Sequence, residues 1–376
     1  MRNPVSKKLK KIIPLFKTFM PPEAKNLLNK TLYSGYLAEG KIAEKFRLEL
    51  SKFIGNEFCV LTNSCTTAIT IAMKICGVGP GTEVITTPLT CIAGNQPILT
   101  LGASPVWADI SRKTGMITSE TIEPLITQKT KAVYVLHKEG SPAEIEDIYK
   151  LKLKYKNLRI IEDGAHAFGA QRNKKKIGSM GDFVCFSFQA IKHITTGDGG
   201  AIFCNNKKDY QTAKKLKWFG VDRDKRNKRD IWREDISEWG FKGNMNDIAS
   251  SIGLSQIKHI NWILERCYEN GKRYDEKFRN IKGIKTLLRD KLDYQTFWGY
   301  TILVENRKKV SDFLTKNGIQ NGQIHVRNDL YSMFKKKTNL PNVDWFDQRE
   351  LAIPTGWWVD RENQDFIIEK VKQAVL

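Results

Sequence analysis

A lysine in a loop rich in hydroxyls and glycines is the residue of this sequence whose surroundings most suggest chemistry. Lys192 follows Ser187 by five residues, and Thr195-Thr196-Gly197-Asp198-Gly199-Gly200 comes shortly after it. Glycines let a backbone approach a ligand closely. An amine whose pKa is lowered in an enclosed site can attack a carbonyl and form a Schiff base, whereas a surface lysine is a solvated charge. A single lysine among many lies most often on the surface. The neighbouring motifs must therefore show whether Lys192 belongs to an enclosed site.

Two further segments could complete such a site. The apolar run Ile160-Ile161 leads into Glu162-Asp163, which places Asp163 at the carboxyl end of a predicted strand. The segment Asn63 to Thr67 is expected to lead from a strand into a helix with hydroxyls in its first turn, where free N–H groups suit a phosphate. Taken singly, each is more often an ordinary turn or helix cap. Together they predict a phosphate site, an acid and an amine at one sheet edge.

The elements that position these residues alternate between strand and helix from about residue 56 to residue 205. This alternation is typical of an α/β fold with a single large, mainly parallel sheet of seven strands flanked by helices, whose ligands bind at the strand carboxyl ends. The expected strands are Phe58 to Thr62, Glu83 to Thr87, Ser104 to Ala108, Ala132 to Leu136, Arg159 to Glu162, Phe183 to Ser187 and Ala201 to Cys204. The expected helices are Thr66 to Cys76, Cys91 to Leu101, Glu144 to Tyr155 and Asp209 to Phe219.

The rest of the chain suggests three parts. Residues 1–20 form a basic N-terminal tail, and residues 21–247 form the large α/β domain with its N-terminal segment. From about Ile248 an amphipathic pattern predicts a long helix through Arg279, followed by mixed strand and helix. We therefore expect a smaller α+β domain over residues 248–376.

Composition limits the function classes. No run approaches the roughly 18 to 20 uncharged apolar residues of a membrane helix, so we expect no membrane anchor. The seven cysteines are scattered and lack CxxC spacing, which argues against a disulfide framework or a metal site and favours the cytoplasm. The net charge of +21 is spread along the chain. It predicts attraction of anionic substrates rather than specific nucleic-acid binding.

These segments resemble the sugar aminotransferases of the DegT/StrS family, which share the type I fold of pyridoxal-phosphate enzymes with aspartate aminotransferase. The resemblance covers nearly the whole chain. It extends to Ser34-Gly35, Thr86 to Thr90, His137 with Gly140, Gly240 to Asp247 and Gly253-Leu254.

The resemblance implies roles for individual residues. Lys192 would hold pyridoxal 5'-phosphate covalently, Asp163 would pair with its ring nitrogen, and His166 would lie by the ring or its phenolic oxygen. The phosphate would be held by Ser64, Cys65, Thr66 and Ser187. Lys242 and Asn244 match the stretch by which a neighbouring subunit completes the site, which implies a homodimer with shared active sites. His325 would face the sugar or serve the fold.

The sequence departs from the family pattern at two cofactor contacts. Cys65 stands where glycine is common, so the phosphate turn can differ in detail. Cys91 stands where an aromatic side chain usually stacks on the cofactor ring, and a thiol offers weaker contact.

The implied function is transfer of an amino group from an amino acid, by likeness glutamate, to a nucleotide-linked keto-sugar for glycan or polysaccharide biosynthesis. Pyridoxamine phosphate would carry the amino group, and 2-oxoglutarate would leave. Two alternatives stay open: a sugar dehydratase of the same family, in which histidine replaces the lysine, and a non-catalytic binding or regulatory homologue. The nucleotide (GDP, UDP or dTDP), the sugar, and amination at carbon 3 or carbon 4 are equally open.

Overall fold

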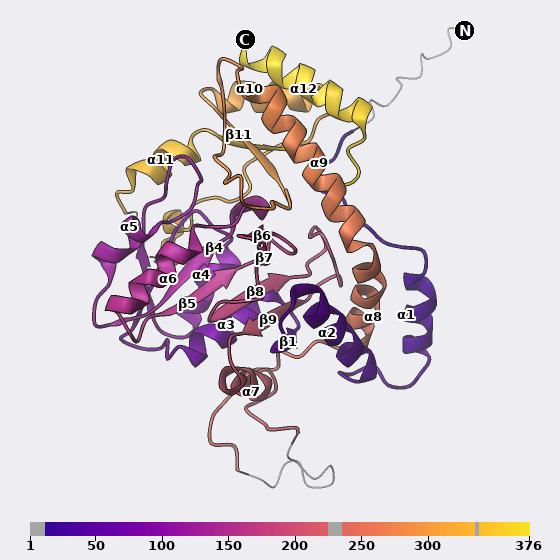
Figure 1. The fold of residues 1–376 in the computed structure, drawn as a ribbon, viewed down its shortest axis with the longest axis vertical. Helices are drawn as coiled ribbons and strands as arrows, with labels where there is room; N and C mark the ends of the chain where they lie inside the picture. The colour runs from indigo at the N-terminus through magenta and orange to yellow at the C-terminus, as the bar shows by residue number, and fades with distance from the viewer. Residues whose placement is uncertain (1–11, 225–234, 335–337) are drawn as a thin grey trace.

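A seven-stranded sheet forms the centre of the molecule (Figure 1). The computed structural model describes residues 12–224, 235–334 and 338–376. The strand order is β1-β9-β8-β5-β4-β2-β3. The strands are β1 (Cys59–Thr62), β2 (Glu83–Thr86), β3 (Ser104–Trp107), β4 (Thr130–Leu136), β5 (Arg159–Asp163), β8 (Phe183–Ser187) and β9 (Gly200–Cys204). All seven lie where the sequence predicts them.

The sheet is mainly parallel, as predicted, with one exception. Strands β8, β5, β4, β2 and β3 pair in parallel, whereas β9 pairs antiparallel with both β1 and β8. A small antiparallel hairpin of β6 (Gln171–Arg172) and β7 (Lys175–Lys176) lies between β5 and β8 in the chain. Strand β9 follows β8 without a crossover helix, so the intervening loop remains at one sheet edge.

Helices cover both faces of the sheet, which explains why the interiors of its central strands are mainly apolar. Within β8, Phe183 and Cys185 pack into the core beneath one set of helices, and Val184 and Phe186 pack beneath α2 on the opposite face. The first set comprises α3 (Cys65–Ile75), α4 (Ile92–Thr100) and α7 (Lys207–Leu216), and the opposite face carries α2 (Lys41–Ile54), α5 (Ser119–Ile122) and α6 (Ile145–Lys154). In the part of the chain that the structure describes, no helix is long and apolar enough to cross a membrane.

A second, antiparallel sheet has its own core. Its strands are β10 (Ile284–Thr286), β11 (Tyr300–Val304) and β12 (Glu350–Ile353), and its core includes side chains of α9 (Ile260–Phe278), α10 (Arg307–Lys316) and α12 (Arg361–Val375). The short helix α11 (Pro341–Asp347) packs instead on the core of the large sheet. Helix α9 contributes Leu264 to the large-sheet core and Ile263 to the smaller one. The exact domain boundary at residue 247 stays a prediction.

The long helix expected from about Ile248 through Arg279 is interrupted. The structure has α8 (Asp247–Gln256), a 3₁₀ turn over Ile257–His259, and then α9. At the junction, Gln256 accepts a hydrogen bond from the Thr195 N–H at 3.0 Å and donates one to the Phe19 carbonyl at 2.7 Å. These two long-range hydrogen bonds fix Gln256 at the junction of the two helices. The helical periodicity of the sequence does not predict them.

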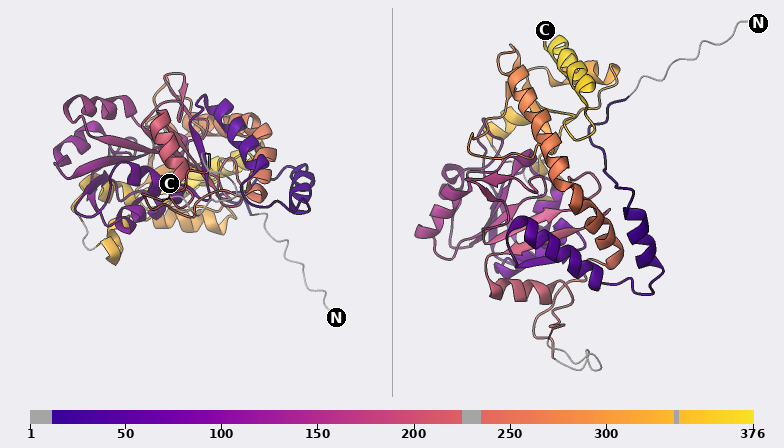
Figure 2. Two further views of the ribbon diagram at one scale, coloured as in Figure 1. Left: turned by 90° about the horizontal axis from the view of Figure 1, so that it is seen from below. Right: turned by 45° about the vertical axis from the view of Figure 1, so that its right-hand side comes forward.

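Residues 12–20, predicted as part of a basic tail, pack against the body of the protein. The buried Ile13 forms a bridge with Ile319, and the Pro14 carbonyl accepts a hydrogen bond from the Trp358 indole at 2.8 Å. Thr18 donates to the Ala190 carbonyl, also at 2.8 Å. Figure 2 shows this stretch running beside α9 toward α1 (Ala24–Leu32). The segment therefore joins the smaller sheet to the loop that carries Lys192.

A buried ionic cluster also joins the two sheets. Lys138, just after β4, lies 3.5 Å from the carboxylates of both Glu139 and Glu350, the latter in β12. Glu139 also accepts a hydrogen bond from Thr301 of β11 at 2.6 Å. Burial would lower the pKa of Lys138, but Glu350 and Glu139 outweigh it and raise that pKa. The ammonium form is therefore the one that holds this junction.

Replacement of Lys138 tests this junction. The variant Lys138→Met would leave two carboxylates buried without their cation, so we expect the free energy of unfolding to fall by about 3–5 kcal/mol in urea titrations. The matched control is Lys150→Met, which removes an exposed cation paired with Asp147 and should cost about 0–1 kcal/mol. Equal losses in the two variants would contradict a structural role for the cluster.

Candidate active site

The predicted site residues gather at one edge of the central sheet because of its strand register. Thr62 at the end of β1 and Ser187 at the end of β8 both lie opposite Gly200, where β9 begins. Asp163 ends β5, the strand next to β8. The loop over residues 188–199 leaves and re-enters the sheet at this edge.

The first turn of α3 forms the candidate phosphate cradle. Ser64 caps this helix, and its Oγ accepts a hydrogen bond from the Thr67 N–H at 3.1 Å. Cys65 and Thr66 begin the helix, where N–H groups have no intrahelical acceptor. A Cβ atom on Gly200 would lie 2.5 Å from the Cys65 nitrogen, so only glycine allows this approach. The cradle and the end of the Lys192 loop are thereby held in contact.

Asp163 is fixed by a tyrosine that the sequence did not single out. The Tyr134 hydroxyl donates a hydrogen bond to Oδ2 of Asp163, and the Ala165 N–H donates to Oδ1 at 2.9 Å. Gly94 leaves space for this phenol, since a Cβ there would lie 2.1 Å from the Tyr134 oxygen. Burial raises the pKa of Asp163, and Tyr134, Ala165 and Lys192 partly oppose that rise. A cationic ring nitrogen beside this carboxylate would offset its desolvation.

Lys192 lies close enough to Asp163, Cys91 and Cys65 for these groups to affect its pKa. Its surroundings remove the amine from water and lower its pKa to about 8, while Asp163, Cys91 and Cys65 oppose this shift. The Lys192 Nζ atom is 3.8 Å from the centre of the Trp298 ring. The amine is therefore poised to lose its proton far more readily than an ordinary lysine.

Trp298 is a site residue that sequence reasoning missed. It stacks on His166 with ring centres 3.9 Å apart, and Phe16 stacks on it from the N-terminal segment at 4.6 Å. Its indole donates a hydrogen bond to the Ile191 carbonyl at 2.8 Å. No local motif marks this tryptophan, which lies more than one hundred residues from Lys192 in the sequence. Only the folded chain brings the two together.

The two histidines of the site are held in the neutral form. Burial lowers the pKa of His166 well below its usual value, and nearby Lys192 adds to this. The Glu139 N–H donates to Nδ1 of His166 at 3.4 Å, which assigns the ring proton to Nε2. His325 lies parallel to His166 with ring centres 5.2 Å apart. Within the described residues, the buried Nε2 of His325 has no hydrogen-bond partner, so it is available to a ligand.

Four further residues that the sequence predicts lie around Lys192 or at the rim of the site. Ser187 is buried at the sheet edge, and its Oγ accepts a hydrogen bond from the Gln189 N–H at 3.3 Å. Cys91 immediately precedes α4 and influences Lys192 electrostatically. Lys242 is exposed, and its Nζ donates to Asn244 at 3.0 Å. Lys242 and Asn244 lie at the rim beside the start of α3. Asn63, which directly precedes the cap of that helix, donates a hydrogen bond to the Lys242 carbonyl.

Comparison with known proteins now identifies this arrangement. The model of the DegT/DnrJ/EryC1/StrS aminotransferase family matches residues 20–372. The chain belongs to this family. The expected resemblance, the type I fold and the use of pyridoxal 5'-phosphate are confirmed, and the match spans the sheet edge and the smaller sheet that together contribute to the site.

Individual members of the DegT/DnrJ/EryC1/StrS family are similar over nearly their full lengths. The Bacillus subtilis spore coat polysaccharide biosynthesis protein SpsC is 31% identical over 93% of both chains. The sugar aminotransferase CalS13 of Micromonospora echinospora has a TM-score of 0.92 at 29% identity, covering 96% of this chain and 100% of that one. The putative sugar aminotransferase Spr1654 of Streptococcus pneumoniae, in its pyridoxal-phosphate form, has a TM-score of 0.89 at 26% identity, covering 97% and 98%.

The lowered pKa of Lys192 gives a pH prediction. Only the unprotonated amine attacks an aldehyde, so the rate at which cofactor-free protein reacts with pyridoxal phosphate should rise with pH and level off above a midpoint near 8. An ordinary lysine would give a midpoint near about 10.4. Stopped-flow absorbance across this range measures the profile. A midpoint above 10 would show that the amine is not desolvated.

Proposed function

We propose that the protein is a pyridoxal-phosphate-dependent aminotransferase that moves an amino group from glutamate to a keto-sugar linked to a nucleotide. One observation carries the proposal: a lysine with a pKa of about 8 stands among a buried acid, two neutral histidines and a helix N-terminus. A structural lysine needs no such surroundings. Membership of an aminotransferase family supports the same conclusion.

The residues present fit pyridoxal 5'-phosphate and pyridoxamine phosphate, the form of the same cofactor that carries the amino group. The cofactor supplies a carbonyl that combines with amines and a ring that withdraws electrons from the attached carbon. The first turn of α3 suits its phosphate, through Ser64, Cys65, Thr66 and Ser187. Asp163 is placed to keep the ring nitrogen protonated, and the Nε2 proton of His166 is available to the phenolic oxygen.

Lys192 has two tasks in this scheme. Its Nζ atom would hold the cofactor, and the same amine, when free, would accept a proton from the α-carbon of the amino donor and deliver it to the carbon that becomes the aminomethyl group. A pKa of about 8 suits both directions of transfer near neutral pH. The contact between Lys192 and Trp298 limits where the displaced amine can move. Trp298 also offers apolar surface in a site where Cys91 supplies only a thiol.

The substrate assignment is supported by the relatives and by His325. SpsC is named for polysaccharide biosynthesis, and CalS13 is named as a sugar aminotransferase. The Nε2 of His325, which has no hydrogen-bond partner among the described residues, suits a sugar hydroxyl. We place the enzyme in the cytoplasm, where nucleotide-linked sugars are made for surface glycans. The lysine at position 192 favours transamination over sugar dehydration, for which the family uses histidine.

A homodimer with shared sites belongs to the proposal. Lys242 is exposed at the rim beside α3 and points its Nζ toward Asn244 rather than toward Lys192. An exposed lysine at this rim is placed to reach the site of a second copy.

Substitution of the lysine tests the proposed reaction. Wild-type protein with pyridoxal phosphate should show a visible band that bleaches when glutamate is added, with release of 2-oxoglutarate. Lys192→Ala should lose both changes and lower turnover by at least about a thousandfold, because the variant lacks the amine that would hold the cofactor and carry the proton. The control is Lys176→Ala, which removes another lysine whose pKa is lowered by burial but which lies against Phe53. Bleaching at wild-type rates in Lys192→Ala would contradict the assignment.

Mixing of variants tests the shared site. Lys192→Ala and Lys242→Ala should each be inactive or nearly so as homodimers. If the two residues act in one site from different subunits, mixing and subunit exchange should restore part of the activity, because each mixed dimer then carries one intact site. The measurement is 2-oxoglutarate formation before and after exchange. Persistent inactivity after exchange, with mixed dimers detected by mass spectrometry, would place both residues in one chain's site.

A further inference from the structure

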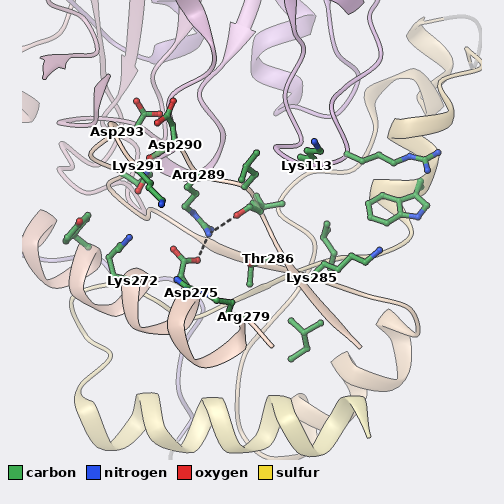
Figure 3. Close-up of a pocket in the computed structure, with 18 residues that line it drawn as sticks. Lys113, Lys272, Asp275, Arg279, Lys285, Thr286, Arg289, Asp290, Lys291 and Asp293 are labelled. Atoms are coloured by element: carbon green, nitrogen blue, oxygen red, sulfur yellow. Dashed lines mark hydrogen bonds and ion pairs between the residues drawn. The ribbon is translucent and has the colours of Figure 1, made fainter. Parts of the chain in front are cut away.

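A basic cavity lies beside β10 and β11 of the smaller sheet, and none of the predicted active-site residues lines it. Its volume is about 740 Å³, within the range of small-molecule sites. It is formed by α9, by β10 with the segment that follows it, and by Arg112 and Lys113 after β3 (Figure 3). Its size and separate lining make it a candidate for a second ligand.

The cavity is lined by more cations than carboxylates. Seven lysines and arginines face three aspartates: Arg112, Lys113, Lys272, Arg279, Lys285, Arg289 and Lys291 against Asp275, Asp290 and Asp293. Two of those aspartates are engaged by a cation that does not line the cavity, since Arg172 lies 3.0 Å from Asp293 and 3.6 Å from Asp290. The remaining positive charge is therefore largely unbalanced within the cavity.

Arg289 gives this cavity a fixed donor. Its side chain is only 7% exposed, and Asp275 holds its Nη1 at 2.5 Å while the Leu287 carbonyl accepts from the same atom at 3.3 Å. Asp275 is itself held by the Tyr300 hydroxyl at 2.9 Å. Within the described residues, the buried Nε of Arg289 has no hydrogen-bond partner. A guanidinium locked in place with an unused donor is a feature of anion sites.

At the other end of the cavity, two cations lie by an aromatic ring. Arg112 and Lys285 stand 5.3 and 5.4 Å from the centre of the Trp345 ring. Lys272 of α9 and Arg279, which directly follows that helix, approach from one side, and Lys113 approaches from the opposite wall (Figure 3). Cations on several walls suit an anion with more than one charged group rather than a single carboxylate.

We propose that this cavity binds a diphosphate group. The fixed Arg289 meets one phosphate, and the exposed cations Lys272 and Lys285 neutralise the charge from two walls. The diphosphate can belong to a nucleoside diphosphate or be inorganic pyrophosphate. The volume admits either. The site goes beyond the proposed transamination, because it lies on residues that the reaction does not use.

Calorimetry on the cofactor-loaded protein tests the proposal, because the cofactor then fills the phosphate cradle. The probes are inorganic pyrophosphate, uridine diphosphate and orthophosphate at one ionic strength. We expect saturable binding of pyrophosphate that weakens at least tenfold in Lys272→Glu and in Lys285→Glu. Lys277→Glu is the matched control, since this exposed residue lies on the same helix and outside the cavity lining. It should bind as the wild type does.

The possible outcomes distinguish a nucleotide from pyrophosphate as the ligand. They also distinguish a failure of this proposal from a failure of the proposed function. Tighter binding of uridine diphosphate than of pyrophosphate, lost in the same two variants, identifies a nucleotide as the ligand; equal binding identifies the diphosphate alone. An equal loss in Lys277→Glu would mean that only the diffuse positive field acts, and the proposal would be wrong. Binding retained in both cavity variants would place the diphosphate elsewhere. Bleaching by glutamate is recorded in each variant and should be unchanged, so a failure here is distinct from a failure of the proposed function.

Discussion

The site exists because one strand of the central sheet runs against the others. A parallel strand after β8 would need a crossover that carried the chain to the opposite edge. Strand β9 instead returns antiparallel, so the loop between Ser187 and Gly200 begins and ends beside the end of β1. Lys192 is thereby kept at the edge where Asp163 and the first turn of α3 already lie. The proposed bond between Lys192 and the cofactor depends on this reversal.

A second constraint is the way in which the two sheets are coupled around Glu139. This residue has a φ of 54°, a backbone conformation that is unfavourable for a side chain other than glycine. In that conformation its N–H meets His166 while its carboxylate meets Thr301 and Lys138. The backbone strain is compensated by contacts on both sides. The orientation of a site histidine is thus tied to the packing of the smaller sheet.

The sequence predicts the local elements well and the long-range contacts poorly, for physical reasons. The central strands are buried on both faces and therefore leave apolar runs in the sequence, and Lys192 stands out because glycines and hydroxyls surround it. Tyr134 lies inside one of those apolar runs, where nothing distinguishes a phenol that binds Asp163 from one that packs. Trp298 enters the site only through tertiary folding. The antiparallel direction of β9 is likewise fixed by strand pairing that no single segment encodes.

The packed N-terminal segment makes the rigidity of the site depend on residues outside the central sheet. Phe16 stacks on Trp298, and Thr18 donates a hydrogen bond to the Ala190 carbonyl in the loop that carries Lys192. Both residues come before residue 20, where the match to the family model begins. Substitutions in this short stretch would therefore loosen Trp298 and the loop without touching the strands that define the fold.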